Sequence, residues 1–273
     1  MVERQAESPA SPRAEAPAIR IESLRVSYAR TLALSETTLE VGPRDFVSLL
    51  GPSGCGKTTL LKAVGGLIKP SSGEIRIGEG SVEEARRAHA FGFVFQDATL
   101  LPWRRTAGNA GLLAEIIGGP AMNRQRIDEL LRAVGLAGFE NSYPGELSGG
   151  MKQRVAIVRA LAFEPRVLLM DEPFAALDAL TRDRLGEVLL NVWAESKPVL
   201  FVTHSIEEAA FLSDRVVVMT ARPGRVLEEV RVDLPRPRTH AMKESREFFE
   251  ITRRLRRLID EAQNGPGGER SDG

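Results

Sequence analysis

Residues 51–59 have the types and the spacing needed to hold a chain of phosphates. They match the pattern G-x-x-x-x-G-K-[ST], and a second threonine follows: Gly51, Pro52, Ser53, Gly54, Cys55, Gly56, Lys57, Thr58 and Thr59. Glycines let the backbone curl so that successive N–H groups point at phosphate oxygens, and the N-terminus of a following helix favours anions. Lys57 would place its charge on the β- and γ-phosphates, and Thr58 would offer its hydroxyl to Mg²⁺. The pattern therefore predicts a nucleoside triphosphate site.

A pair of acids follows a second apolar segment. Residues 167–170 read Val-Leu-Leu-Met, and Asp171 and Glu172 come next. An unpaired buried carboxylate is costly, so two acids at the end of a buried strand need a reason. Mg²⁺ is a natural partner for Asp171, and Glu172 could polarise an attacking water. The plainer alternative is a strand that simply ends in solvent.

Ser148, Gly149 and Gly150 precede a predicted helix and form a second candidate anion site. By themselves these residues fit a loop and a helix cap equally well. A single phosphate loop, however, leaves this second turn with no phosphate to bind. A head-to-tail homodimer would resolve this, because each nucleotide would lie between the phosphate loop of one subunit and the Ser-Gly-Gly turn of the other.

The elements that must position these motifs alternate between strand and helix. Apolar runs and near-alternating patterns predict strands, and apolar residues at helical spacing predict helices. We expect strands near 19–26, 46–50, 74–77, 92–95, 167–170, 199–203 and 216–219, and helices at 57–64, 149–163, 181–194 and 206–212. Asn123 is expected to cap a further helix with the apolar face Ile127, Leu130, Leu131 and Val134. The alternation predicts an α/β fold with a parallel sheet and a mainly helical insertion at about 98–162.

The composition sets limits on the class of protein. The length of 273 residues suits about two domains or one large one, and 42% hydrophobic residues exclude wholesale disorder. Lys plus Arg and Asp plus Glu are both 37, which disfavours a globally basic nucleic-acid binder. The single cysteine excludes an intramolecular disulfide and fits a reducing compartment. No apolar run approaches the ~18 residues needed to span a bilayer, and no signal-peptide pattern opens the chain. A soluble, cytoplasmic protein is therefore expected.

The two ends of the chain differ from its centre. Residues 1–18 and 265–273 offer little to bury, and we expect disordered tails there. Between 239 and 264, apolar residues recur at helical spacing and predict an amphipathic helix: Phe248, Ile251, Leu255, Leu258 and Ala262. Basic residues outnumber acidic ones between 236 and 257. A solvated outer face explains this excess most simply, and contact with anionic lipid or nucleic acid is the alternative.

Taken in order, these motifs resemble the ATP-binding subunit of an ATP-binding-cassette (ABC) transporter. The resemblance covers about 19–232, within an expected cassette domain at 19–238. It implies a P-loop NTPase (RecA-like) core of parallel strands, an N-terminal antiparallel β subdomain and an inserted helical subdomain. It also implies ATP and Mg²⁺ as ligands, with Asp171 binding the metal and Glu172 as the catalytic carboxylate.

The resemblance assigns roles that the residue types alone leave undecided. Gln96 matches the glutamine that joins the core to the helical subdomain and touches Mg²⁺ and the attacking water. His204 matches the γ-phosphate switch histidine, and Tyr28 matches the aromatic that stacks on adenine, although each alone would suit a structural role. The family signature spans 147–153, and the loop that crosses the dimer interface spans 176–178. Further nucleotide-binding residues are implied there: Ser148, Gly149, Gly150, Gln153 and Asp178. The implied catalytic set is Lys57, Gln96, Glu172 and His204.

Two further segments narrow the resemblance to one branch. Residues 100–103 read Leu-Leu-Pro-Trp, and residues 221–225 read Ala-Arg-Pro-Gly-Arg. They are similar to the nitrate/sulfonate/taurine group of bacterial importers. Trp103 is then expected where the helical subdomain receives the coupling helix of the permease, with packing inside the subdomain as the alternative.

That branch implies a set of partners and a place in the cell. The expected function is ATP hydrolysis that powers uptake of a nitrate-, sulfonate- or taurine-like anion, or a related small molecule, through a separate membrane permease. The expected partners are a second cassette subunit, the permease and, indirectly, an extracytoplasmic substrate-binding protein, with no nucleic acid. The expected location is the cytoplasmic face of the bacterial inner membrane, as a peripheral subunit. An exporter ATPase, or a soluble cassette ATPase that acts on ribosomes or DNA, is the alternative.

Overall fold

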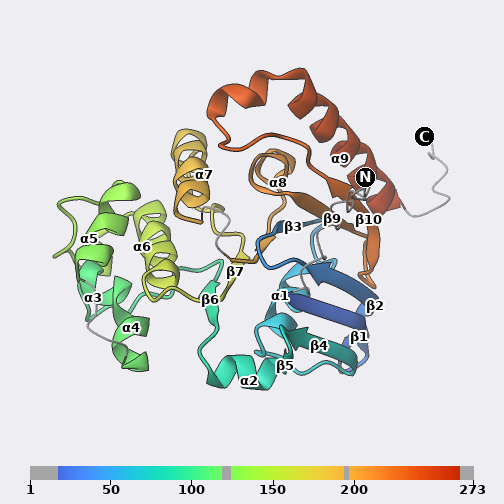
Figure 1. Cartoon of the computed structure of the whole chain (residues 1–273), viewed down its shortest axis with the longest axis horizontal. Coiled ribbons are helices and arrows are strands. Elements are labelled where there is room, and N and C mark those ends of the chain that lie inside the picture. The colour runs from blue at the N-terminus through green and yellow to red at the C-terminus, as the bar shows by residue number, and fades with distance from the viewer. Residues whose placement is uncertain (1–17, 119–123, 194–196, 265–273) are drawn as a thin grey trace, which may run out of the picture.

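The computed structural model describes residues 18–118, 124–193 and 197–264. Figure 1 shows two sheets with helices around them and a separate group of helices at one end of the molecule. The expected cap Asn123 and the end of the expected helix at Ala194 lie outside the described residues, as do the expected tails apart from Ala18.

The first sheet is antiparallel and is built from the N-terminal part of the chain. Its strands run in the order β2 (Thr31–Val41), β1 (Ile19–Tyr28), β4 (Ser72–Ile77) and β5 (Gly80–Ser81). Ile19 pairs with Val41 on one side and with Ile77 on the other. Buried Ile19 and Ile21 alternate with exposed Arg20 and Glu22, as on a strand with one face in the core. The predicted N-terminal antiparallel sheet is confirmed.

The second sheet has the order β10 (Val226–Arg231), β9 (Arg215–Met219), β3 (Phe46–Leu50), β8 (Val199–Val202), β7 (Val167–Asp171) and β6 (Phe91–Val94). Five of these strands are parallel, and β10 pairs antiparallel with β9 at the edge. β3, β7 and β8 are buried along their whole length, which explains why their sequences are apolar apart from Ser48 in β3 and Asp171 at the end of β7. The predicted α/β core is confirmed.

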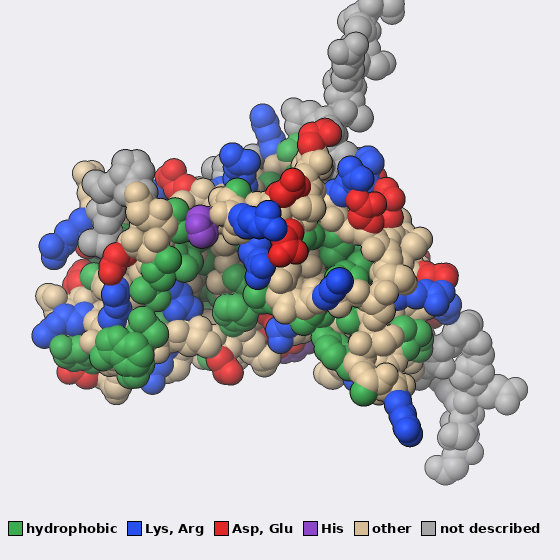
Figure 2. Space-filling model, turned by 90° about the horizontal axis from the view of Figure 1, so that it is seen from below, with side chains coloured by type: hydrophobic (Ala, Val, Ile, Leu, Met, Phe, Trp, Pro, Cys, Tyr) green, Lys and Arg blue, Asp and Glu red, His purple; other side chains and the backbone are tan. Residues whose placement is uncertain are grey.

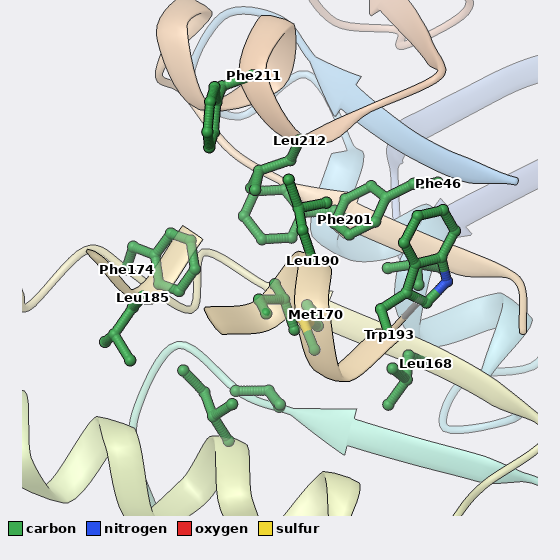
Figure 3. Packing of buried hydrophobic residues seen from close by; sticks show 14 of the residues in the cluster. Phe46, Leu168, Met170, Phe174, Leu185, Leu190, Trp193, Phe201, Phe211 and Leu212 are labelled. Carbon is green, nitrogen blue, oxygen red and sulfur yellow. The ribbon is translucent and has the colours of Figure 1, made fainter. Parts of the chain in front are cut away.

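Helices cover the parallel sheet, and an aromatic core lies between the sheet and two of them. α1 (Lys57–Val64) contacts β7 and β8, and α7 (Ala179–Trp193) contacts α8 (Ile206–Leu212). Figure 3 shows Phe46, Phe201 and Trp193 meeting on the side of the sheet where α7 and α8 pack, and these rings share one core cluster with both helices. The rings of Phe46 and Trp193 meet edge to face, with centroids 5.4 Å apart. Such pairs add about 0.5–1.5 kcal/mol beyond the burial of their area.

The helical subdomain contains α3 (Thr106–Ala110), α4 (Leu112–Ile117), α5 (Arg124–Ala133), a 3₁₀ helix (Pro144–Glu146) and α6 (Gly149–Leu161). Ile127, Leu130 and Leu131 are buried, as their helical spacing predicts. The fully buried Asn109 receives a hydrogen bond from the Leu101 amide and donates to the Leu101 and Arg104 carbonyls. Asn109 therefore fixes the loop that presents Trp103.

Two more helices complete the described structure. α2 (Val82–Arg87) follows β5, and α9 (Arg246–Asn264) follows a 3₁₀ helix (His240–Glu244). α9 packs on α8, β9 and β10 with its apolar side, while Arg253, Arg256 and Arg257 are exposed. Its buried side chains are Phe248, Leu255, Leu258 and Ala262. Across the described ranges, no helix combines the length and the apolar character needed to cross a membrane.

Candidate functional site

The phosphate loop connects β3 to α1 and borders a cleft of about 450 Å³. Gly54 and Gly56 have φ values of 73° and 101°, which L side chains rarely adopt. A Cβ atom on Gly56 would also lie 2.6 Å from Cδ2 of Leu34 in β2. The ammonium group of Lys57 donates to the carbonyls of Gly51 at 2.7 Å and Pro52 at 3.0 Å. The cleft is lined by Tyr28, Thr31, Ala33, Ser53, Gly54, Gly56, Lys57, Thr58, Thr59, Glu172 and Arg222.

Asp171 stands at the end of β7, directly beside the start of α1. The Thr58 hydroxyl donates to Oδ1 of Asp171 at 2.8 Å, and only 3% of Asp171 is exposed. Burial raises the pKa of this carboxyl, against the bond from Thr58 and the nearby charge of Lys62. A buried carboxylate and a hydroxyl oxygen are ligands suited to Mg²⁺, which takes its other ligands from phosphates and water. Two of the three residues predicted for the metal, Thr58 and Asp171, therefore fit it, and a contact from Gln96 stays a prediction.

Glu172 and His204 meet across neighbouring strands. Oε2 of Glu172 lies 3.2 Å from Nδ1 of His204, and the Glu172 amide donates to the Val202 carbonyl at the end of β8. Glu172 has a φ of 45°, a strained conformation for a side-chain-bearing residue and one that concentrates at functional sites. The parallel register of β7 and β8 brings these two residues together.

Gln96 is exposed in the loop after β6, and two side chains of α6 hold that loop on either side of it. Gln153 donates to the Phe95 carbonyl at 3.0 Å, and Arg159 donates to the carbonyls of Ala98 and Thr99 at 2.9 Å each. Burial lowers the pKa of Arg159. Gln153, predicted to bind nucleotide, is only 2% exposed, and its side-chain amide donates its hydrogen bond to the Phe95 carbonyl. In this conformation it positions the loop that carries Gln96, and a direct nucleotide contact stays a prediction.

The signature turn begins α6 and does not border this cleft. The Ser148 hydroxyl caps α6 by accepting from the Met151 amide at 3.2 Å. A Cβ on Gly149 would meet open space, whereas one on Gly150 would lie 3.0 Å from Cδ2 of Leu177 in the next loop. No residue of α6 is among those that line the cleft. Within one subunit, the structure thus keeps the two predicted anion sites apart.

Asp178 ends the loop that packs against the signature turn. Its carboxylate accepts from the Thr181 amide at 3.0 Å at the start of α7, and hydrogen bonds from Thr181 lower its pKa. Like the signature turn, Asp178 is absent from the lining of the cleft. Its predicted contact with nucleotide stays a prediction.

Two other predicted residues lie as follows. Tyr28 lines the cleft and is 47% exposed, so its ring is available to an adenine. Cys55 is fully buried, with Sγ 3.7 Å from Nζ of Lys57.

Arg222 also lines the cleft, although the sequence indicated its segment only as a feature of the importer branch. Its approach to the phosphate loop depends on β9 lying next to β3, which the sequence does not show.

Exposed apolar side chains gather on the helical subdomain. Trp103 is 71% exposed and Ile116 is 67% exposed. Figure 2 shows hydrophobic surface at the end of the molecule that this subdomain forms. Packing within the subdomain, the alternative role for Trp103, does not account for a side chain with this exposure.

Comparisons with known proteins agree with this geometry. The family described as "ABC transporter" matches residues 34–175. An uncharacterized ABC transporter ATP-binding protein of Methanocaldococcus jannaschii, MJ0412, is 48% identical over 84% of this chain and 85% of its own length. The aliphatic sulfonates import ATP-binding protein SsuB of Bacillus cereus is 45% identical over 81% of this chain and 86% of its own. A dimeric post-hydrolysis structure of the ATP-binding cassette MJ0796, bound to ADP and Pi, superposes with a TM-score of 0.72 at 32% identity and covers 80% of this chain and 100% of that one. The chain therefore belongs to the ABC transporter family, as an ATP-binding subunit.

Proposed function

We propose that this chain hydrolyses ATP in the cleft beside the phosphate loop to drive import of a small organic anion, such as a sulfonate, through a separate permease. The observation that carries the chemistry is the convergence of Lys57, Thr58, Asp171, Glu172 and His204 at one end of the parallel sheet. A phosphate cradle, a metal-binding acid and a paired second acid are the parts that phosphoryl transfer to water requires.

The residues of the cleft divide the work of hydrolysis. Thr58 and Asp171 would hold Mg²⁺, which supplies charge neutralisation for the phosphates when bound. Lys57 would exchange its bonds to the Gly51 and Pro52 carbonyls for phosphate oxygens. Glu172 would orient the attacking water, and His204 would hold Glu172 in place and contact the γ-phosphate. Gln96 would touch Mg²⁺ and the water, and Tyr28 would stack on adenine.

A head-to-tail homodimer would complete the site. Ser148, Gly149 and Gly150 do not line the cleft of their own subunit, so they would meet a γ-phosphate across an interface with a second one. Asp178, beside this turn, would cross the same interface. ATP would then close the dimer, and hydrolysis would reopen it. The dimeric form of the similar cassette MJ0796 supports this arrangement.

Variants of two acidic residues test the catalytic assignment. Glu172→Gln is expected to bind ATP, to accumulate as a dimer in size-exclusion chromatography with light scattering, and to lose at least ~100-fold in turnover, since general-base removal typically costs 10²–10⁴. Glu207→Gln, an exposed acid on α8, is the matched control and should hydrolyse ATP normally. Wild-type turnover in the Glu172 variant would remove this residue from its role.

Import requires a membrane partner, and Trp103 is the proposed contact. The permease would dock on the apolar surface of the helical subdomain, so that this chain sits peripherally at the cytoplasmic face of the inner membrane. The permease would in turn receive the solute from an extracytoplasmic binding protein. The similar sulfonate import protein supports a solute of this class.

Affinity purification from gently solubilised cells tests the partner. A tagged wild-type protein should recover a multi-span permease at comparable amounts by mass spectrometry, and Trp103→Ser should lose it while still binding ATP. Phe249→Ser, which alters a 64% exposed aromatic on α9, is the matched control. Recovery of ribosomes or DNA-repair proteins without a permease would instead support the soluble alternative. Stimulation of the ATPase of the recovered complex by a sulfonate-loaded binding protein would then define the solute.

A further inference from the structure

The turn between β9 and β10, residues 220–225, is fixed against the phosphate loop. The Gly224 amide donates to the Ala33 carbonyl at 2.9 Å, and the Ser35 amide donates to the Gly224 carbonyl at 2.8 Å, so β2 holds the turn from one side. A Cβ on Gly224 would lie only 1.8 Å from the Cys55 carbonyl oxygen. Glycine is therefore required for the turn to lie this close to the loop.

The far side of the same turn is tied to the C-terminal helix. The Ala221 amide donates to the carbonyl of Ala262, near the end of α9, at 3.1 Å. The Thr220 amide donates to the Arg225 carbonyl at 3.0 Å and closes the turn itself. With backbone bonds to β2, to α9 and within itself, the turn presents its side chains from a defined position.

Arg222 is the side chain that this turn extends over the cleft. Its Nη2 lies 3.4 Å from the Gly54 carbonyl, a long and weak hydrogen bond. It borders the same cleft as Lys57 and Thr58. Among the ion pairs of the described residues, none joins Arg222 to a carboxylate. A guanidinium without a carboxylate partner thus stands at the edge of a triphosphate site.

We propose that Arg222 binds the phosphate chain of the nucleotide as a second cation beside Lys57, which makes the β9–β10 turn part of the nucleotide site. The inference rests on the proposed use of this cleft for ATP. The planar guanidinium can bind two phosphate oxygens at once. A hydrogen bond to a charged phosphate is stronger than the long hydrogen bond that Arg222 now makes to the Gly54 carbonyl. Its neighbour Gly54 belongs to the loop that cradles phosphates, so the contact is to phosphate rather than to adenine.

Two arginines of the same turn give a matched test. Arg222→Gln and Arg225→Gln each remove one charge from an exposed position, but only Arg222 lines the cleft. Displacement of a fluorescent ATP analogue by ATP, ADP and AMP would be measured for the full-length protein with Mg²⁺. Arg222→Gln should weaken ATP and ADP binding by about 5- to 10-fold, the lower end for a charged hydrogen bond at an exposed site. AMP binding should change less than twofold, and Arg225→Gln should leave all three unchanged.

Other outcomes separate this inference from its alternatives. Arg222→Lys should give an intermediate loss, because it keeps the charge and loses the fork. Equal losses for ATP and AMP would show that Arg222 only braces Gly54, and equal effects of the two Gln variants would show only a surface charge effect; either overturns the inference. Lys57→Ala should abolish ATP binding. If the wild-type protein does not bind ATP, the proposed function is wrong. If it binds ATP and Arg222→Gln binds equally well, only the inference about Arg222 is wrong.

Discussion

The side chain of Gln153 donates a hydrogen bond to the backbone carbonyl of Phe95 across 3.0 Å, and these residues are 58 positions apart in the sequence. Phe95 directly precedes Gln96, and Gln153 lies in the same helix that Ser148 begins. This hydrogen bond therefore joins α6, which follows the signature turn, to the loop that carries Gln96. In the proposed dimer, a rotation of α6 on closure would move the loop that carries Gln96.

Breaking this bond should impair hydrolysis more than binding. Gln153→Leu leaves the Phe95 carbonyl without its partner, a penalty of about 1–3 kcal/mol. We expect kcat to fall about 10-fold with KM for ATP nearly unchanged, because the cleft itself is untouched. Gln125→Leu is the control, since Gln125 is exposed on α5 and donates to Glu129 of the same helix. Equal kcat values for the two variants would contradict the positioning role.

The elements that carry the motifs were predictable because each has a strong local signal. The mainly apolar run of β3 and the helix that begins at Lys57 were predicted with the bounds that the structure has. β10 was not predicted, because two consecutive glutamates interrupt its apolar pattern at the sheet edge. β2 was not predicted either, although its burial alternates along much of its length.

The features of the site that were not predicted depend on tertiary contacts. The burial of Gln153 depends on Phe95, and the position of Arg222 depends on a turn brought to the phosphate loop by the order of strands. A sequence motif indicates which residues lie near a ligand. It does not show that one of them, such as Gln153, holds a neighbouring loop in place. Signature positions therefore need the structure before roles are assigned one by one.

The buried face of α9 should contribute measurably to stability. Leu255 is fully buried among the side chains that dock α9 onto the core, so Leu255→Ala should lower the free energy of unfolding by about 2–4 kcal/mol. Urea denaturation followed by circular dichroism measures this. Phe249→Ala, on the exposed side of the same helix, should change stability by less than about 0.5 kcal/mol. A similar loss in both variants would mean that helix propensity, rather than docking, is measured.

Lys197 should make stability depend on pH in the alkaline range. Burial lowers the pKa of this lysine in the folded protein below its usual value of 10.5. The unfolded chain then binds the proton more tightly, so stability rises as pH increases through the window between the lowered pKa and 10.5. Lys197→Met should therefore raise Tm relative to wild type at pH 7, and the difference should shrink towards pH 10. Lys69→Met, at an exposed position, should show no such trend; a constant difference for Lys197→Met would contradict the assignment.

Cys55 offers a direct probe of the phosphate loop, because it is the one cysteine of the chain. Its sulfur is fully buried, and a Cβ on Gly51 would lie only 3.0 Å from it, so the loop leaves no room for a larger group. A bulky maleimide should react slowly with the native protein and fast in denaturant, and MgATP should slow the native reaction further by holding the loop closed. The fully labelled protein should lose at least ~10-fold in ATP affinity, since displaced loop amides cost several charged hydrogen bonds. Cys55→Ala should bind ATP normally, because Cys55 is not among the residues that line the cleft and its thiol is buried. Full affinity after complete alkylation would show that this part of the loop does not hold the nucleotide.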